Sequence, residues 1–554
     1  MKLLKTRALT PLMVALCALP AHADSAGESI FSFSGFATLG LVATNDSGAD
    51  FVISGQPRGA TKSVSGDVDS KIGVQATAKF NQMFSATAQL LSKQNGDGNY
   101  KPELEWAFGK AQFSPSLALR VGRMGGPFFA VSDFRDVGYA NTWLRPPQDV
   151  YGQVPVSHFD GADLSYQMPM GSATVTAQVF GGKANSVLKG VDFDMQKLMG
   201  LNATAEFDNG LTLRFGHVQG RLNVHSSSLA QLVAILRSTP FAAVGNQLDA
   251  TDKKASFTGL GLSWDQGNWI TLFEYTKRKT ESFVPDTTGW YLTLGYRYGK
   301  FTPYATVSQL KQDDSNVVNS IPTGVSPQLN PEGDGGWHDP GTEQSAKDHR
   351  SWSSLGCLPE CRGEGAVRAH HTGWPGPLHQ PAARLWRRWL RQCLQRVCGL
   401  RVLRREANMR IRMSKQVARA SLGLALLCVS AWAQAQVAVI VNPKSPTASM
   451  TAEQVSNIFL GKSNTLPSGS AAQAAELPES SATREVFYTK VTGKSAAQVK
   501  AAWSRLVFSG KATPPKEMAS SAELKKFVAA NPDAIAYIEK SAVDGSVKVV
   551  LSVD

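Results

Sequence analysis

Four polar residues near the C-terminal end of the chain, Ser480, Ser481, Thr483 and Arg484, have the types and spacing of an anion site. They lie where a helix is predicted to begin, so free backbone N–H groups, hydroxyl groups and the helix dipole would converge on one point. Arg484 would add a bidentate pair of hydrogen bonds to a phosphate or similar anion. The same residues also fit an ordinary helix cap beside a solvated arginine, and that alternative stays open.

Cysteine and histidine gather in one short region, where zinc binding is the chemistry to consider. These residues are Cys357, Cys361, His370, His371, His379, Cys393 and Cys398. Their spacings miss the usual pairs of zinc ligands, and an exported chain is a poor setting for four free thiolates. We therefore predict no metal site and no cofactor.

Catalytic motifs are missing from the sequence, which contains no nucleophile elbow, phosphate-cradling glycine loop or H-E-x-x-H motif. Only 18% of the 554 residues are charged and 42% are hydrophobic, which excludes a disordered chain and a long coiled coil. The net charge of +13 arises from 57 basic residues at an ordinary density, so it does not indicate nucleic-acid binding. We predict that the protein is not an enzyme and binds no nucleic acid.

Two segments have the pattern of a secretory signal peptide. Residues 1–23 place basic residues before a short apolar run and small residues at its end, and residues 409–436 repeat that order. Both apolar runs are shorter than the ~20 residues that a transmembrane helix needs. We therefore interpret the chain as two exported proteins joined end to end.

Residues 24–330 consist of stretches of about ten residues in which apolar residues alternate with small or polar ones, the period of a two-faced strand. Residues 201–207 turn at Asp208-Asn209-Gly210 into residues 211–217, as in a tight hairpin. Short turns alternate with long connections, one of which contains a predicted helix at 228–236. The pattern predicts an antiparallel transmembrane β-barrel, with a soluble β-sandwich as the competing fold.

The most informative long connection is residues 122–151. Its motifs are Gly122-Arg123, Ser132-Asp133, Val137-Gly138-Tyr139 and Trp143-Leu144-Arg145-Pro146-Pro147. On these motifs, residues 1–330 resemble the porins of Gram-negative bacteria, which are trimeric barrels of sixteen strands. The resemblance implies that this connection folds into the lumen and narrows it. Opposed acids and bases would then sort solutes by charge, although each is equally compatible with a loop salt bridge. The constriction residues implied are Arg123, Asp133, Arg135, Asp136 and Arg145.

The strand count indicates an incomplete barrel. About thirteen strands precede residue 311, whereas a bacterial barrel closes with an even number, and an open edge leaves polar groups that lipid cannot solvate. The alternating pattern is lost in residues 331–408, which we predict to be irregular. Decoded one nucleotide later with permitted codons, parts of this region give alternating strands and then a stop. A frameshift that fused two neighbouring genes explains this pattern.

Residues 437–554 predict a small, separate α/β unit that makes few contacts with the sheet. Residues 437–441 form a buried type of strand, a capped helix follows at 451–461, and further helices and strands continue to residue 550. The segments 458–462, 479–487 and 534–538 resemble the periplasmic phosphate-binding proteins of ABC transporters, a likeness that covers residues 409–554. At about 118 residues, the unit is much shorter than a two-lobed binding protein.

Together these patterns predict an outer-membrane porin for passive diffusion of small hydrophilic solutes, fused to a periplasmic unit that binds phosphate or a similar anion. Residues 24–330 would lie in the outer membrane and residues 437–554 in the periplasm. The implied partners are outer-membrane lipid, the solutes, the anion and further copies of the barrel in a homotrimer. A surface adhesin or structural barrel protein with a non-binding accessory domain is the alternative.

Overall fold

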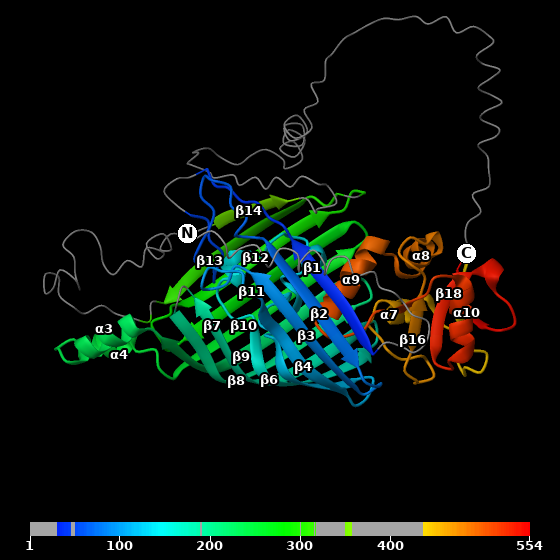
Figure 1. Cartoon of the computed structure of the whole chain (residues 1–554), viewed down its shortest axis with the longest axis horizontal. Helices are drawn as coiled ribbons and strands as arrows, with labels where there is room; N and C mark the ends of the chain where they lie inside the picture. Colours follow the sequence, from blue (N-terminus) through cyan, green and yellow to red (C-terminus); the bar gives the residue numbers. More distant parts are fainter. Residues whose placement is uncertain are drawn as a thin grey trace, which may run out of the picture.

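The computed structural model describes residues 30–45, 50–188, 191–299, 301–314, 316, 350–356 and 436–553, and it describes residues 350–356 by their backbone alone. The first signal peptide, all but the last residue of the second, and the cysteines and histidines between residues 357 and 398 lie outside this part of the chain. The described residues form two units, a fourteen-stranded sheet and a five-stranded sheet (Figure 1).

A single antiparallel sheet forms the first unit, and each strand pairs with the next one in the sequence. Its strands are β1 (Phe31–Thr38), β2 (Lys71–Lys79), β3 (Phe84–Lys93), β4 (Glu103–Gln112), β5 (Leu117–Gly125), β6 (His158–Met170), β7 (Ala173–Leu188), β8 (Val191–Phe207), β9 (Leu211–His225), β10 (Lys253–Gln266), β11 (Trp269–Thr280), β12 (Asp286–Tyr296), β13 (Tyr304–Asp314) and β14 (Arg350–Gly356). The sheet curls into a tilted wall (Figure 1), so the predicted antiparallel strands are confirmed.

The hairpin expected around Asn209 is confirmed. Glu206 at the end of β8 pairs with Thr212 at the start of β9. Gly210 has a φ of +80°, a left-handed conformation that side chains with a Cβ rarely adopt. The helix expected at 228–236 is α3 (Ser227–Arg237), which is followed by α4 (Ala242–Leu248) in the long connection between β9 and β10. The connections that follow β2, β4, β6, β8 and β10 are turns of two to four residues at one end of the wall, the short-turn end, whereas the longest connections, which follow β1, β5 and β9, lie at the other end.

The outer face of the wall is apolar. In β2, Ile72 and Val74 are exposed, whereas Gln75 points inward and is buried. The same alternation exposes further large apolar side chains around the wall, at Leu90, Val121, Leu164, Val179, Leu201, Leu213, Leu260 and Leu294. The exposed aromatic residues Trp269 and Tyr296 lie at the short-turn end. An apolar band that ends in aromatic side chains is the surface that a lipid bilayer solvates.

The two edges of the sheet are β1 and β14, and within the described residues they do not pair with each other. Thirteen strands precede residue 315, which agrees with the count of about thirteen. However, β14 lies inside residues 331–408, so the prediction that this region is irregular is wrong for residues 350–356. Val307 on β13 pairs with Trp352 there. Without β14, the edge of β13 would leave its N–H and C=O groups unpaired, and such an edge is a template for one more strand.

The second unit is a mixed sheet covered by helices. Its strands are β15 (Val437–Val441), β16 (Gln473–Glu476), β17 (Lys516–Glu517), β18 (Ala534–Glu539) and β19 (Lys548–Val553), in the order β17-β16-β18-β15-β19. Its helical segments are α7 (Ala452–Phe459), α8 (Ala482–Phe487), η3 (Tyr488–Thr492), α9 (Ala496–Phe508), α10 (Ser521–Ala530) and η4 (Lys540–Ala542). Thr451 and Ser495 each form a capping box, which fixes where α7 and α9 begin.

The second unit has a core of its own, centred on β15, which is fully buried, and on β18, which is buried except at its last residue. Nevertheless, the prediction that it makes few contacts with the barrel wall is wrong. Gln75 of β2 donates a hydrogen bond of 2.8 Å to the carbonyl of Val507 in α9. Phe508 packs against residues of the first unit rather than in the core of its own unit. Burying this ring against the wall and the inward-folding connection removes apolar surface from water.

Candidate functional site

The connection between β5 and β6 folds into the lumen of the curled sheet. It contains η1 (Ser132–Phe134), η2 (Gly138–Ala140) and α2 (Gln148–Tyr151). Phe129, Trp143 and Tyr151 are buried in one cluster with wall residues such as Phe159 and Tyr291. We call residues 126–157 the inward loop. Its aromatic side chains therefore anchor it to the wall.

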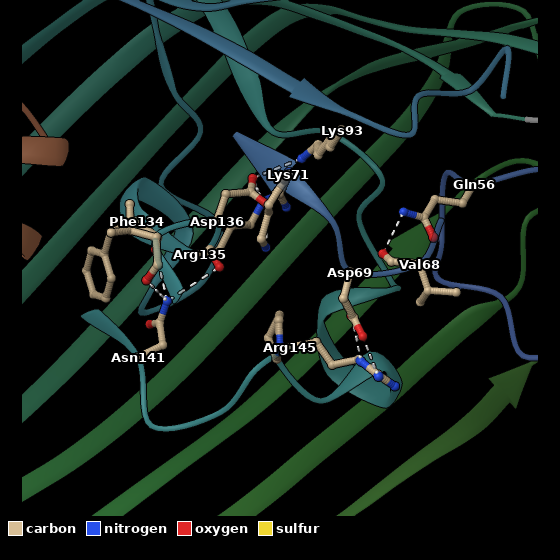
Figure 2. Close-up of polar contacts among 12 residues, drawn as sticks. Gln56, Val68, Asp69, Lys71, Lys93, Phe134, Arg135, Asp136, Asn141 and Arg145 are labelled. Atoms are coloured by element: carbon tan, nitrogen blue, oxygen red, sulfur yellow. Dashed lines mark hydrogen bonds and ion pairs between the residues drawn. The ribbon is translucent and has the colours of Figure 1, made fainter. Parts of the chain in front are cut away.

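Asp136 of the inward loop lies between cations from the wall (Figure 2). Its Oδ1 accepts a hydrogen bond of 3.1 Å from Lys71 Nζ, and its Oδ2 accepts one of 2.9 Å from Lys93 Nζ. Arg135 Nε lies 3.9 Å from the same carboxylate. Burial disfavours the charged carboxylate, but the ion pairs with Lys93, Lys71 and Arg135 outweigh burial and hold the pKa of Asp136 well below its usual range.

Arg145 attaches the inward loop to a second lumenal segment (Figure 2). Its Nε and Nη2 atoms donate hydrogen bonds of 3.0 and 2.7 Å to the carboxylate of Asp69, and its guanidinium lies over the ring of Phe51. This bidentate pair connects the inward loop with the long connection between β1 and β2. Arg123 pairs with its wall neighbour Asp160, at 2.7 and 2.9 Å. Asp133 lies 3.5 Å from Lys511 of the second unit.

The candidate anion site in the second unit lies at the start of α8. Arg484 is buried and donates from Nε and Nη2 to the carboxylate of Glu476, at 3.0 and 3.2 Å. Its Nη1 is buried and has no hydrogen-bond partner among the described residues. Thr483 donates to Glu539, whereas Ser480 is exposed and Ser481 half-buried. The two nitrogens of Arg484 that were predicted to bind an anion are thus occupied by Glu476. Nη1 of Arg484 and the hydroxyls of Ser480 and Ser481 remain as candidate donors to an anion.

The sequence of the first unit decides the family. The family model for Gram-negative porins matches residues 8–315, more than half of the chain. The chain belongs to the Gram-negative porin family. The sequence has no match among curated proteins.

Solved structures show likenesses to both units of this porin. An anion-selective porin from Comamonas acidovorans has 13% identity and a TM-score of 0.27, covering 51% of this chain and 90% of its own. Salmonella typhi OmpF has 12% identity and a TM-score of 0.33, and the match covers 62% of this chain and 86% of OmpF. An ABC-type phosphate transport receptor from Vibrio cholerae has 23% identity and a TM-score of 0.17, and the match covers 21% of this chain and 46% of the receptor. The match to the phosphate receptor thus covers less than half of the receptor's length.

Sequence reasoning missed the partners of the loop charges in this porin. Lys71, Lys93 and Asp69 were not among the predicted site residues, although they form the ion pairs with Asp136 and Arg145. A signal was present, because Lys71 and Lys93 occupy directly paired positions on neighbouring strands and share the inward face with Gln75. Two lysines that share an inward face indicate an acidic partner in the lumen.

In the part of the chain that the structure describes, no three His, Cys, Asp or Glu side chains are placed to hold a metal ion. The helices described here include none that is long and apolar enough to cross a membrane.

Proposed function

We propose that this outer-membrane porin lets small hydrophilic solutes diffuse passively past the inward loop. The observation that carries this proposal is a wall with an apolar outer face and a charged lumen, narrowed by a loop that is anchored at Asp136 and Arg145. An adhesin would have no need of a charged loop inside its barrel. We also propose that copies of the barrel assemble as a homotrimer.

Within the pore, the charged side chains around the inward loop act as the solute filter. Three cations, Lys71, Lys93 and Arg135, surround the carboxylate of Asp136. The side chain of Lys93 is 32% exposed, the largest exposure among these charged groups. Its charge therefore acts most directly on an ion in the lumen, even though Asp136 partly balances it.

The variant Lys93→Gln tests this function in planar bilayers. Wild-type protein is expected to show discrete conductance steps, and the variant an anion-to-cation permeability ratio about fourfold lower. One charge at ~8 Å in water is worth about 0.5 kcal/mol, which is close to a factor of two for each ion and acts in opposite directions on the anion and the cation. The control is Lys101→Gln, an exposed residue in the connection between β3 and β4. If the wild-type protein shows no conductance steps, the porin function is contradicted. If Lys93→Gln and Lys101→Gln have equal anion-to-cation permeability ratios, the role of Lys93 in the solute filter is contradicted.

For the second unit, we propose a periplasmic domain that binds phosphate or a similar anion at Ser480, Ser481, Thr483 and Arg484. Support comes from the buried Nη1 of Arg484, which lacks an acceptor among the described residues, at the start of a helix preceded by two serines. In this arrangement Thr483 holds Glu539, while Nη1 and the serine hydroxyls donate to the anion. The unit contacts the barrel at its short-turn end, which faces the periplasm in bacterial outer-membrane barrels.

The double variant Ser480→Ala/Ser481→Ala in the full chain tests the anion site. Arg484→Ala is unsuitable because it would leave Glu476 buried without a counter-charge. The serines take no part in the core, and a hydrogen bond to a charged group contributes about 1.5–3 kcal/mol. We therefore expect phosphate or sulfate affinity to fall at least tenfold by titration calorimetry, whereas Ser468→Ala leaves it unchanged. If wild-type protein gives no heat of binding with millimolar phosphate or sulfate, the four residues form only a helix cap.

We further propose that residues 1–408 and 409–554 descend from two exported proteins whose genes became joined. Support comes from β14, which pairs with β13 although it lies beyond residue 315, where the match to the porin family ends. The second signal-like segment at 409–436 then begins the second protein. Resequencing the DNA from codon 320 to codon 415 tests this origin, and a confirmed open reading frame without a frameshifted strand sequence would contradict it.

A further inference from the structure

The second unit lies across the short-turn end of the barrel wall. Gln167, near the end of β6, donates a hydrogen bond of 2.8 Å to the carbonyl of Lys462. Lys462 Nζ lies 3.6 Å from Asp208 in the turn between β8 and β9. Asn464 donates a hydrogen bond of 3.1 Å to the carbonyl of Pro115 in the turn between β4 and β5. The unit is therefore held at several turns around the same mouth of the barrel.

From this mouth, the end of α9 and the loop after it enter the lumen. We call residues 505–511 the plug segment. Three inward-facing side chains of the wall donate to its backbone carbonyls: Gln75 to Val507 at 2.8 Å, Arg120 to Ser509 at 3.0 Å, and Lys110 to Lys511 at 3.0 Å. The last carbonyls of a helix carry partial negative charge, so cationic side chains of the wall suit this end of α9.

An aromatic side chain anchors the plug segment. Phe508 is only 2% exposed and packs with Phe36, Leu91, Val137 and Ala140 of the barrel and inward loop. Its ring meets the ring of Phe36 edge-on, with centroids 5.2 Å apart. Phe508 does not belong to the core of the second unit, so its apolar packing partners in the cluster come from the barrel and the inward loop.

The plug segment also contacts the inward loop. Arg505 Nε donates a hydrogen bond of 2.8 Å to the carbonyl of Ala140, and its guanidinium lies 5.8 Å from the ring centroid of Phe134. Gly510 has a φ of +65°, and a Cβ there would lie 2.5 Å from Phe108 Cζ. Only glycine fits this turn against the wall. The plug segment thus occupies the space beneath the inward loop, where solutes would leave the pore.

We propose that the plug segment closes this pore from the short-turn side, so that the second unit controls permeation by docking and undocking. This inference rests on the proposed porin function. The seat is formed by the wall residues Gln75, Lys110 and Arg120 and the apolar pocket around Phe508.

The variant Phe508→Asp tests closure. A carboxylate cannot remain in this apolar pocket without a partner, so the plug segment should leave its seat. Because Phe508 lies outside the core of its own unit, the unit should remain folded. In planar bilayers we expect the open probability of the full chain to rise at least tenfold. The matched control is Ala522→Asp, which places the same acid on an exposed position in the first turn of α10 and should conduct like wild type.

A second measurement follows docking independently of conductance. Phe508→Cys should react with a water-soluble maleimide at least tenfold more slowly than Ala522→Cys, as read by mass spectrometry on the tryptic peptide that contains each residue. Fast labelling at position 508 would overturn docking. Slow labelling with equal open probabilities for wild type and Phe508→Asp would overturn closure while the porin function stands. Absence of conductance steps in both proteins would overturn the porin function and, with it, closure.

Discussion

Replacing Glu476 with alanine is expected to destabilise the second unit by about 3–5 kcal/mol, because the change leaves a buried cation without its partner. Glu476 is 6% exposed and accepts hydrogen bonds from two nitrogens of Arg484 and, at 2.6 Å, from the hydroxyl of Tyr488. Burial and the neighbouring carboxylate raise the pKa of Tyr488 far above its usual value, so its hydroxyl remains a donor. A loss of this size is a large part of a typical domain stability of 5–15 kcal/mol.

Hydrogen exchange in the full-length protein measures this loss. Amides of β18, at the centre of the second unit, should exchange about two to four orders of magnitude faster in Glu476→Ala than in wild type. Glu476→Gln should fall between them because it keeps an acceptor. Glu479→Ala is the control, since its ion pair with Lys500 is exposed and worth little. An exchange rate in Glu476→Ala within threefold of wild type would show that the ion pair does not hold the unit together.

Replacing Glu274 with alanine is expected to release the inward loop. Glu274 on β11 is only 1% exposed and accepts from Tyr151 at 2.5 Å, from Tyr291 at 2.8 Å and from the backbone N–H of Ala130 at 2.8 Å. Tyr151 and Ala130 belong to the loop, so one carboxylate joins two points of the loop to the wall. Each buried donor left without an acceptor costs about 1–3 kcal/mol, so the three donors predict a loss of at least about 3 kcal/mol.

Chymotrypsin cleavage within residues 126–157 measures the release, because cleavage follows the population of the detached loop. A loss of about 3 kcal/mol raises that population about a hundredfold, and Glu274→Gln should give a smaller increase. The matched control is Glu281→Ala, an exposed residue paired with Lys254 at 3.5 Å, which should change cleavage less than twofold. Equal cleavage of Glu274→Ala and wild type would show that the aromatic packing alone holds the loop.

The strands, the tight turn at Asn209-Gly210 and the boundaries of α7 and α9 could be predicted from the sequence because each depends on neighbouring residues. Alternation over two residues defines a strand face, and Thr451 and Ser495 cap helices within three residues of themselves. The motifs of residues 122–151 likewise indicated a loop in the lumen, through resemblance to a family that the sequence match later confirmed.

Only the tertiary structure decided which side chains meet. Asp136 pairs with lysines 43 and 65 residues away, and Arg145 with an aspartate 76 residues away. Arg484 pairs with Glu476 rather than being left for an anion alone, and Phe508 is buried by another unit of the chain. No local period encodes such contacts, because they depend on how the sheet curves and which inward positions it brings opposite the loop. The sequence alone therefore determined the elements and the family, whereas the curvature of the wall determined the site.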